Sequence, residues 1–93
     1  MDDQTREHRI LRERARHAIQ SGRVPRRRPD RMLGGLGRGR ICAICDELIT
    51  LTQMEREVEY RRKGSETDLL WYTFHPRCFT AWDFERTKFD SAE

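Results

Sequence analysis

Residues 69–89 read LLWYTFHPRCFTAWDFERTKF, and this stretch contains seven of the eight aromatic residues of the chain. From Leu69 to His75 the side chains are apolar or aromatic on both alternating faces, which is typical of a central strand. Pro76 suits the first position of a helix, because its missing N–H would have no partner there. The helix that follows, to about Phe89, is predicted to bury one side. The residues on that side are Cys78, Phe79, Trp82, Glu85, Arg86 and Phe89.

His75 and Cys78, at the junction of this strand and helix, are two potential metal ligands separated by two residues. Cys42 and Cys45, earlier in the chain, form a second pair with the same spacing. Two thiolates two residues apart can hold one ion from a tight turn, and a His and a Cys three positions apart lie one helical turn apart. The full spacing, C-x2-C-x29-H-x2-C, uses every cysteine of the chain. It predicts one structural Zn²⁺ with four ligands, which are Cys42, Cys45, His75 and Cys78.

The cysteines are also compatible with roles that need no structural metal. Cys42 and Cys45 have the spacing of a redox dithiol, but such a pair opens a helix within a βαβ pattern, which this sequence does not show. Buried thiols without metal are a second alternative. A catalytic zinc keeps an open coordination position, whereas four good ligands leave none, so we expect no enzymatic activity. Three cysteines also do not make a disulfide framework.

Length and composition predict one small domain that a metal stabilises. Hydrophobic residues make up 35% of the chain and charged residues 38%, close to the limit at which apolar burial offsets the entropy lost on folding. Residues 1–40 contain no aromatic residue, so the core is expected within residues 41–93, the zinc-binding module. A module that short usually needs a metal or a disulfide. No segment has the apolar pattern of a signal peptide or a membrane span, and we expect a cytoplasmic protein.

Residues 1–40 divide into a predicted helix and a basic linker. Residues 4–20 are rich in helix formers, with Thr5 as the candidate N-cap and Ser21-Gly22 as the stop. Residues 21–40 contain two prolines, five glycines and seven arginines, and are predicted to form a linker or basic arm without a regular element. The predicted helix has a narrow apolar stripe, formed by Ile10, Leu11, Ala15, Ala18 and Ile19.

The glycine run at residues 34–39, Gly-Gly-Leu-Gly-Arg-Gly, has the composition of a phosphate-binding loop. Such loops follow a strand and open a helix, whereas this one leads to the first pair of zinc ligands. We therefore expect these glycines to let the chain pass close to the metal site or to remain mobile.

Between the two ligand pairs the pattern predicts a β-hairpin. Val58 and Tyr60 alternate with charged residues, which indicates a strand with one solvated face, although residues 53–62 are also compatible with a short helix. Lys63-Gly64-Ser65 is the predicted turn. With Ile41–Asp46 as a zinc knuckle, the predicted fold is a small α+β zinc-stabilised domain. It consists of the knuckle, the hairpin and a C-terminal helix, preceded by the N-terminal helix and the basic linker.

Several further side chains have two interpretations. His8 and His17 lie on the predicted N-terminal helix and are expected to be solvated rather than metal ligands. Phe84 falls off the main helical stripe, so it either closes the far side of the core or is an exposed contact residue. Three aromatic residues are expected to pack in the core rather than to form a stacking platform: Trp71, Phe79 and Trp82.

The order of knuckle, hairpin and ligand-bearing helix is similar to that of treble-clef zinc fingers. Residues 41–86 resemble the fingers of poly(ADP-ribose) polymerases, which also combine C-x2-C, a long hairpin insert and H-x2-C with adjacent aromatics. The matching stretch is Trp71–Phe79, followed by Trp82. By this resemblance Cys42, Cys45, His75 and Cys78 would be the ligands. Residues 25–86 also resemble a family of small uncharacterised bacterial zinc-binding proteins, which share the proline-basic segment, the glycine run and both ligand pairs.

Charge is distributed unevenly along the chain. Residues 1–40 carry 12 arginines against five acidic residues, whereas residues 41–93 carry seven Lys and Arg against 11 acidic residues. The polymerase fingers bind broken DNA through a basic surface, but here the module is acidic and the positive charge lies in the arm. We therefore expect non-specific nucleic-acid binding through the arm, since arginine binds phosphate bidentately. The arginines concerned are Arg23, Arg26, Arg27, Arg28, Arg31, Arg38 and Arg40.

A protein–protein interaction module is the alternative function. In that case the zinc module would be a rigid platform, and helix 4–20 would dock on a partner or on a second copy. We expect neither a membrane partner nor a small-molecule substrate. The location of the charges in the folded chain discriminates between the two functions. One contiguous positive face favours nucleic acid, and a basic arm folded onto the acidic module favours a protein partner.

Overall fold

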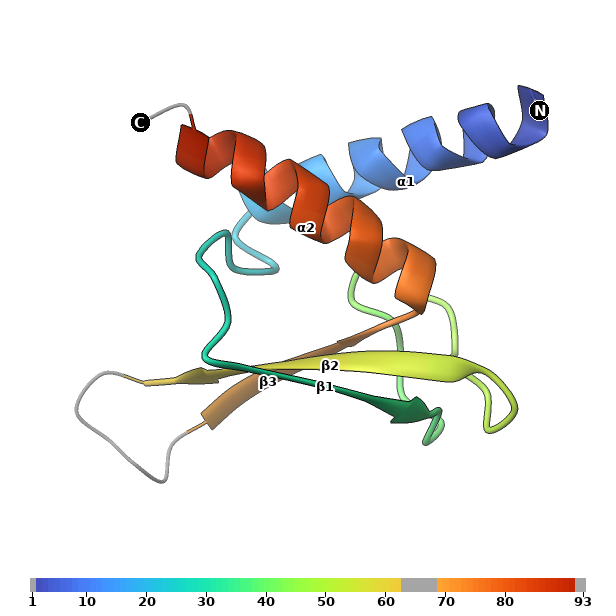
Figure 1. Ribbon diagram of the computed structural model, residues 1–93, viewed down its shortest axis with the longest axis vertical. Coiled ribbons are helices and arrows are strands. Elements are labelled where there is room, and N and C mark those ends of the chain that lie inside the picture. Colours follow the sequence, from blue (N-terminus) through green and yellow to red (C-terminus); the bar gives the residue numbers. More distant parts are fainter. Residues whose placement is uncertain (1, 63–68, 92–93) are drawn as a thin grey trace.

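The computed structural model describes residues 2–62 and 69–91. In chain order the elements are α1 (Asp2–Gln20), β1 (Arg31–Leu36), β2 (Met54–Arg61), β3 (Leu69–Phe74) and α2 (Pro76–Ser91). The strands form one antiparallel sheet in the order β1-β2-β3, and both helices lie on the same side of it (Figure 1). The chain is therefore a small α+β domain with a helical layer over a sheet.

Both predicted helices are confirmed. α1 begins at Asp2, so Thr5 lies inside the helix and is not its N-cap. α1 stops where predicted, because Gly22 adopts a φ of 79° and its N–H donates to the carbonyl of Ile19. α2 begins at Pro76, directly after β3.

The two helices pack against each other and cross at an angle, with their chains running in broadly the same direction (Figure 1). Arg16 Nε donates to Glu85 Oε1 at 2.9 Å, and the Arg12 guanidinium lies 5.1 Å from the ring centre of Phe84. Ala15 and Ala18 are fully buried, and their small side chains permit a close approach of the helices. α1 is therefore part of the folded domain rather than a loosely attached segment.

The predicted hairpin is confirmed as β2 and β3, and the alternative of a helix at residues 53–62 is wrong. Val58 pairs with Tyr72, and Tyr60 pairs with Leu70. The proposed turn at residues 63–65 lies outside the described residues. β3 is an edge strand rather than the predicted central strand, and its first three residues are exposed.

The prediction that residues 21–40 contain no regular element is wrong. β1 pairs with β2 throughout, from Arg31 opposite Glu59 to Leu36 opposite Met54, so that β2 becomes the central strand. An edge strand tolerates glycine because its pairing needs only backbone groups, and Gly34 and Gly35 supply these. The basic linker is therefore in part a strand of the sheet.

The face of the sheet toward the helices, here called the inner face, carries the core. Phe74 stacks on Trp82 of α2 with ring centres 5.1 Å apart. The expectation that residues 41–93 alone build the core is wrong, because α1 and the loop after it also contribute to it. The core residues from this first part of the chain are Leu11, Ala15, Ala18, Ile19 and Val24.

Candidate metal centre

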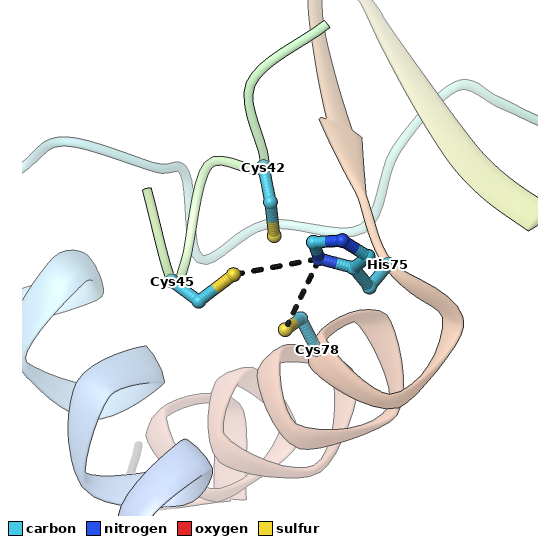
Figure 2. A group of neighbouring side chains, drawn as sticks. All are labelled: Cys42, Cys45, His75 and Cys78. Carbon is cyan, nitrogen blue, oxygen red and sulfur yellow. Dashed lines mark hydrogen bonds between the residues drawn. The ribbon is translucent and has the colours of Figure 1, made fainter. Parts of the chain in front are cut away.

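Two separate parts of the chain position the four predicted ligands. Cys42 and Cys45 lie in the turn-rich segment between β1 and β2, whereas His75 follows β3 and Cys78 lies in the first turn of α2 (Figure 2). The knuckle is closed by hydrogen bonds from Cys42 N to Glu47 O and from Asp46 N to Cys42 O, and Asp46 has a φ of 63°. These bonds present both thiols to the β3–α2 junction.

The four side chains converge on one point, as Figure 2 shows, and their ligand atoms all lie within 4.8 Å of one another. Cys45 Sγ is 3.4 Å and Cys78 Sγ 4.0 Å from His75 Nδ1. A tetrahedral zinc with ordinary bond lengths requires sulfur–nitrogen separations of about 3.6 Å. Cys42, Cys45, His75 and Cys78 are therefore close enough to bind one metal ion, as their spacing in the sequence predicts.

The surroundings of the thiols favour a bound cation. Cys42, Cys78 and His75 are buried, whereas Cys45 is partly exposed. The hydrogen bond from the Cys78 thiol, followed by backbone N–H groups of the knuckle and His75, lowers the pKa of Cys42 to about 4. The hydrogen bond with Cys42 raises the pKa of Cys78, and burial raises that of Cys45. Three adjacent thiolates repel one another, so a divalent cation is what would stabilise all three together.

Within residues 2–62 and 69–91, this is the one group of His, Cys, Asp and Glu side chains arranged to hold a metal. His8 and His17 are exposed on α1 and lie outside it. The backbone further ties the knuckle to the sheet, because Ala43 N donates to Thr73 O. The metal centre thus connects the knuckle, the sheet and α2.

Four of the seven arm arginines are paired with acidic groups of the module: Arg23, Arg38, Arg40 and, at the other end of the sheet, Arg31. On the outer face of the sheet, Arg38 contacts Glu55 and Glu57 at 2.8 Å, and Arg40 contacts Glu57 at 2.8 Å. Glu55 and Glu57 are only 3% and 7% exposed, so the predicted solvated face of this strand is instead covered by arginine. Arg23 lies 3.5 Å from Asp46 of the knuckle.

Arg31 and the other three arm arginines lie at the opposite end of the sheet, where β1 begins and β2 ends. Arg27 donates to the carbonyl of Arg61, and the Arg61 N–H donates to Asp30. Arg31 lies opposite Glu59, with their charged groups 4.0 Å apart. We call this part of the molecule the basic end. Its arginines are Arg26, Arg27, Arg28, Arg31, Arg61 and Arg62.

Tyr60 fixes the basic end to the core. Its hydroxyl donates to the carbonyl of Arg27 at 2.9 Å, and the Arg27 guanidinium lies 4.7 Å from the ring centre. Burial raises the pKa of Tyr60 above its ordinary value. The arm is therefore ordered here by a hydrogen bond, a cation–π contact and strand pairing.

Tyr60 is expected to make stability fall in alkali. A tyrosine whose folded pKa exceeds its unfolded value of about 10 stabilises the fold below that pH and loses this contribution above it. Urea unfolding from pH 8 to 11 should show a decrease above about pH 10. Tyr60→Phe should lose about 1 kcal/mol at pH 8 through the missing hydrogen bond, and its decrease in alkali should be smaller. Tyr72→Phe is the control; a wild-type pH profile in Tyr60→Phe would contradict the prediction.

The structure decides between the two interpretations that the sequence left open for four aromatic side chains. Trp71 is not in the predicted core: it is 49% exposed on the outer face, where Arg40 stacks 4.1 Å from its ring centre. Phe79 is partly buried and Trp82 fully buried, as predicted. Phe84 is 46% exposed, which selects the contact-residue interpretation for it.

No known protein family, curated protein or solved structure matches this chain. No helix within the described residues has the length and apolarity needed to cross a membrane. The function is therefore inferred from the arrangement of the residues in the structure.

Proposed function

We propose that the protein is a non-enzymatic, zinc-stabilised module that binds nucleic acid non-specifically through its basic end. The observation that carries this proposal is the convergence of arginines from residues 26–31 with Arg61 and Arg62 at one end of the sheet. This assignment narrows the nucleic-acid surface expected from the sequence. Arg23, Arg38 and Arg40 fold onto acidic groups of the module, which is the arrangement expected for a protein partner, so the proposal rests on the basic end alone.

Zinc is the metal that the ligand set supports best. Three thiolates and one imidazole in a tetrahedral arrangement favour Zn²⁺ over the oxygen-preferring Mg²⁺ and Ca²⁺. The four side chains fill all positions, so the ion would hold the fold together and not activate water. The order of knuckle, hairpin and α2 supports assignment to the treble-clef type.

Electrostatics supports phosphate as the ligand of the basic end. Six arginines gather at the basic end, where Arg27 pairs with Asp30 and Arg31 pairs with Glu59. Guanidinium groups bind phosphate oxygens bidentately. The cluster lies on strand ends and a loop rather than on a helix that could enter a groove. Binding is therefore expected to follow the phosphate backbone without strong sequence preference.

A salt titration tests the proposal. The zinc-loaded chain should bind short mixed-sequence duplex DNA with log affinity falling against log salt at a slope of roughly −3.5 to −5.5, which corresponds to about four to six phosphate contacts. A double Arg28→Gln and Arg62→Gln variant should reduce the steepness of this slope by roughly 1.8. Both residues are exposed, and Arg27, which holds Tyr60, is left intact.

The matched control is Arg6→Gln with Arg9→Gln, two exposed arginines of α1. It removes the same charge and should leave the slope within experimental error. Absence of binding at low salt, or an equal loss in both double variants, would refute the assignment to the basic end. Parallel titrations with single-stranded DNA and RNA would show which nucleic acid is preferred.

A further inference from the structure

A groove lies between the two helices, and none of its lining residues is a predicted metal ligand or an arginine of the basic end. It has a volume of about 390 Å³ and is lined by His8, Leu11, Arg12, Arg77, Thr80, Ala81 and Phe84. Residues of α1 and α2 form its walls, so the groove exists only because α1 packs on α2. Its volume falls within the range of about 300–1,000 Å³ that ligand-binding sites usually have.

The floor of the groove is apolar and includes an exposed aromatic ring. Leu11 and Ala81 are buried beneath it, whereas Phe84 is 46% exposed. Large exposed aromatics beside a concave surface are characteristic of interaction sites, because their burial contributes strongly to binding.

Two arginines, Arg12 and Arg77, line the groove, and Lys88 lies beside it without lining it. Arg12 and Lys88 both approach the ring of Phe84, at 5.1 and 4.8 Å from its centre. Arg77 and His8 also line the groove, and Arg77 pairs with Glu7. Lys88 also lies 3.4 Å from the buried Glu85, so the fold holds it beside the ring. An apolar floor with cationic side chains beside it is complementary to an apolar ligand that carries acidic groups.

We propose that this groove docks an acidic amphipathic helix of a partner protein. Such a helix would place aliphatic or aromatic side chains on Phe84, Leu11 and Ala81, and carboxylates beside Arg12, Arg77 and Lys88. Anchors at i, i+3 or i+4, and i+7 are the usual pattern for a helix in a groove. A polyanion without an apolar face would not use the groove floor, which is why a protein partner fits better than nucleic acid.

The probe is a pair of synthetic peptides of about 15 residues, a length near the minimum for a helix in water. Both have leucines at i, i+3, i+4 and i+7; one carries Glu on its polar face and the other Lys. We expect saturable binding of the Glu peptide to the zinc-loaded chain, measured by fluorescence anisotropy. The Lys peptide should bind at least about tenfold more weakly, since its charges face cations of the same sign.

Variants locate the binding to the groove. Phe84→Ala should weaken Glu-peptide binding by about tenfold or more, which is the effect of a loss of an aromatic anchor. Arg12→Glu should also weaken it by about tenfold, whereas Arg9→Glu, the same change at an exposed position of α1, should alter it by less than about threefold. Each variant is first checked for one bound metal and an unchanged circular dichroism spectrum. Phe84→Leu keeps an apolar floor and should retain most of the affinity, which separates a lost anchor from a damaged fold.

Three results would overturn the proposal. One is no saturable binding of the Glu peptide up to roughly 1 mM. The second is equal affinity of the Glu and Lys peptides, or equal loss in Arg12→Glu and Arg9→Glu. The third is mixed-sequence DNA that displaces the peptide and loses affinity in Phe84→Ala, which would assign the groove to a nucleic-acid surface. None of these results depends on whether the basic end binds nucleic acid.

Discussion

Removal of the metal with a chelator is expected to unfold the protein. Structural zinc binding in small fingers is worth an apparent 10–16 kcal/mol or so, whereas a whole domain is usually stable by only about 5–15 kcal/mol. A domain of this size has few buried side chains to replace that contribution. The loss of zinc should therefore exceed the stability that packing alone provides.

The location of the ligands explains why the effect should be global. Cys42 and Cys45 lie between β1 and β2, whereas His75 and Cys78 lie where β3 passes into α2. Without the metal, the raised pKa values of Cys45 and Cys78 keep these thiols protonated, and the knuckle is held mainly by hydrogen bonds such as Ala43 N to Thr73 O. Trp82 and Phe74 pack next to this junction, so their environment should change with it.

The measurement is far-ultraviolet circular dichroism and tryptophan fluorescence during titration with a chelator and then with Zn²⁺. We expect loss of structure, and recovery that is complete at one equivalent of zinc. Cys78→Ser should behave like the chelated chain, whereas His17→Ala, which removes an exposed histidine of α1, should not. Acid should have the same effect as the chelator, because protons compete with zinc for the thiolates. A metal-free chain with the spectrum of the wild type would show that the metal is not structural.

Local patterns in the sequence are sufficient to predict the helices, the hairpin and the ligand cluster. The stop of α1 at Gly22 and the start of α2 at Pro76 are properties of single residues and their neighbours. Within each pair the ligands are close along the chain. Only the contact between the two pairs depends on the tertiary fold. The separation of Cys42–Cys45 from His75–Cys78 by a hairpin makes that meeting predictable.

β1 cannot be recognised in the same way. Its six residues, RMLGGL, show no alternation of apolar and polar side chains, because two of them are glycines. What makes this segment a strand is its pairing with β2, which lies some twenty residues later in the chain. The same pairing moves β3 to the edge of the sheet, where Trp71 is exposed.

The charge pattern is misleading for a related reason. Glu55 and Glu57 alternate with apolar residues, which normally indicates a face exposed to water. In the fold, Arg38 and Arg40 reach across this face from the segment after β1 and cover both carboxylates. Composition gives the sum of the charges in each half of the chain, but only the fold shows which arginines are paired across the sheet and which gather at the basic end.

Gly37→Ala is expected to destabilise the protein by about 3 kcal/mol or more, near the upper part of the range for overpacking. A Cβ at this position would lie 2.1 Å from the carbonyl oxygen of Thr50 and 3.0 Å from the side chain of Ile49. Thr50 O belongs to the backbone, so a change of rotamer cannot relieve the clash. Gly37 thus permits a close passage of the chain beside Thr50 and Ile49, whereas the close passage expected from the sequence is beside the metal site.

The consequences of this substitution should extend to the metal centre. Gly37 N donates to Gln53 O directly after β1, and Ile49 N donates to Arg40 O two residues before Cys42. Separating these segments would displace both the end of β1 and the approach to the knuckle. Gly35→Ala is the matched control, because a Cβ there meets nothing within 4 Å. Urea unfolding and a competition assay for zinc should both be impaired in Gly37→Ala and remain near wild type in Gly35→Ala. Equal effects in the two variants would mean that the loss comes from glycine itself and not from the contact with Thr50.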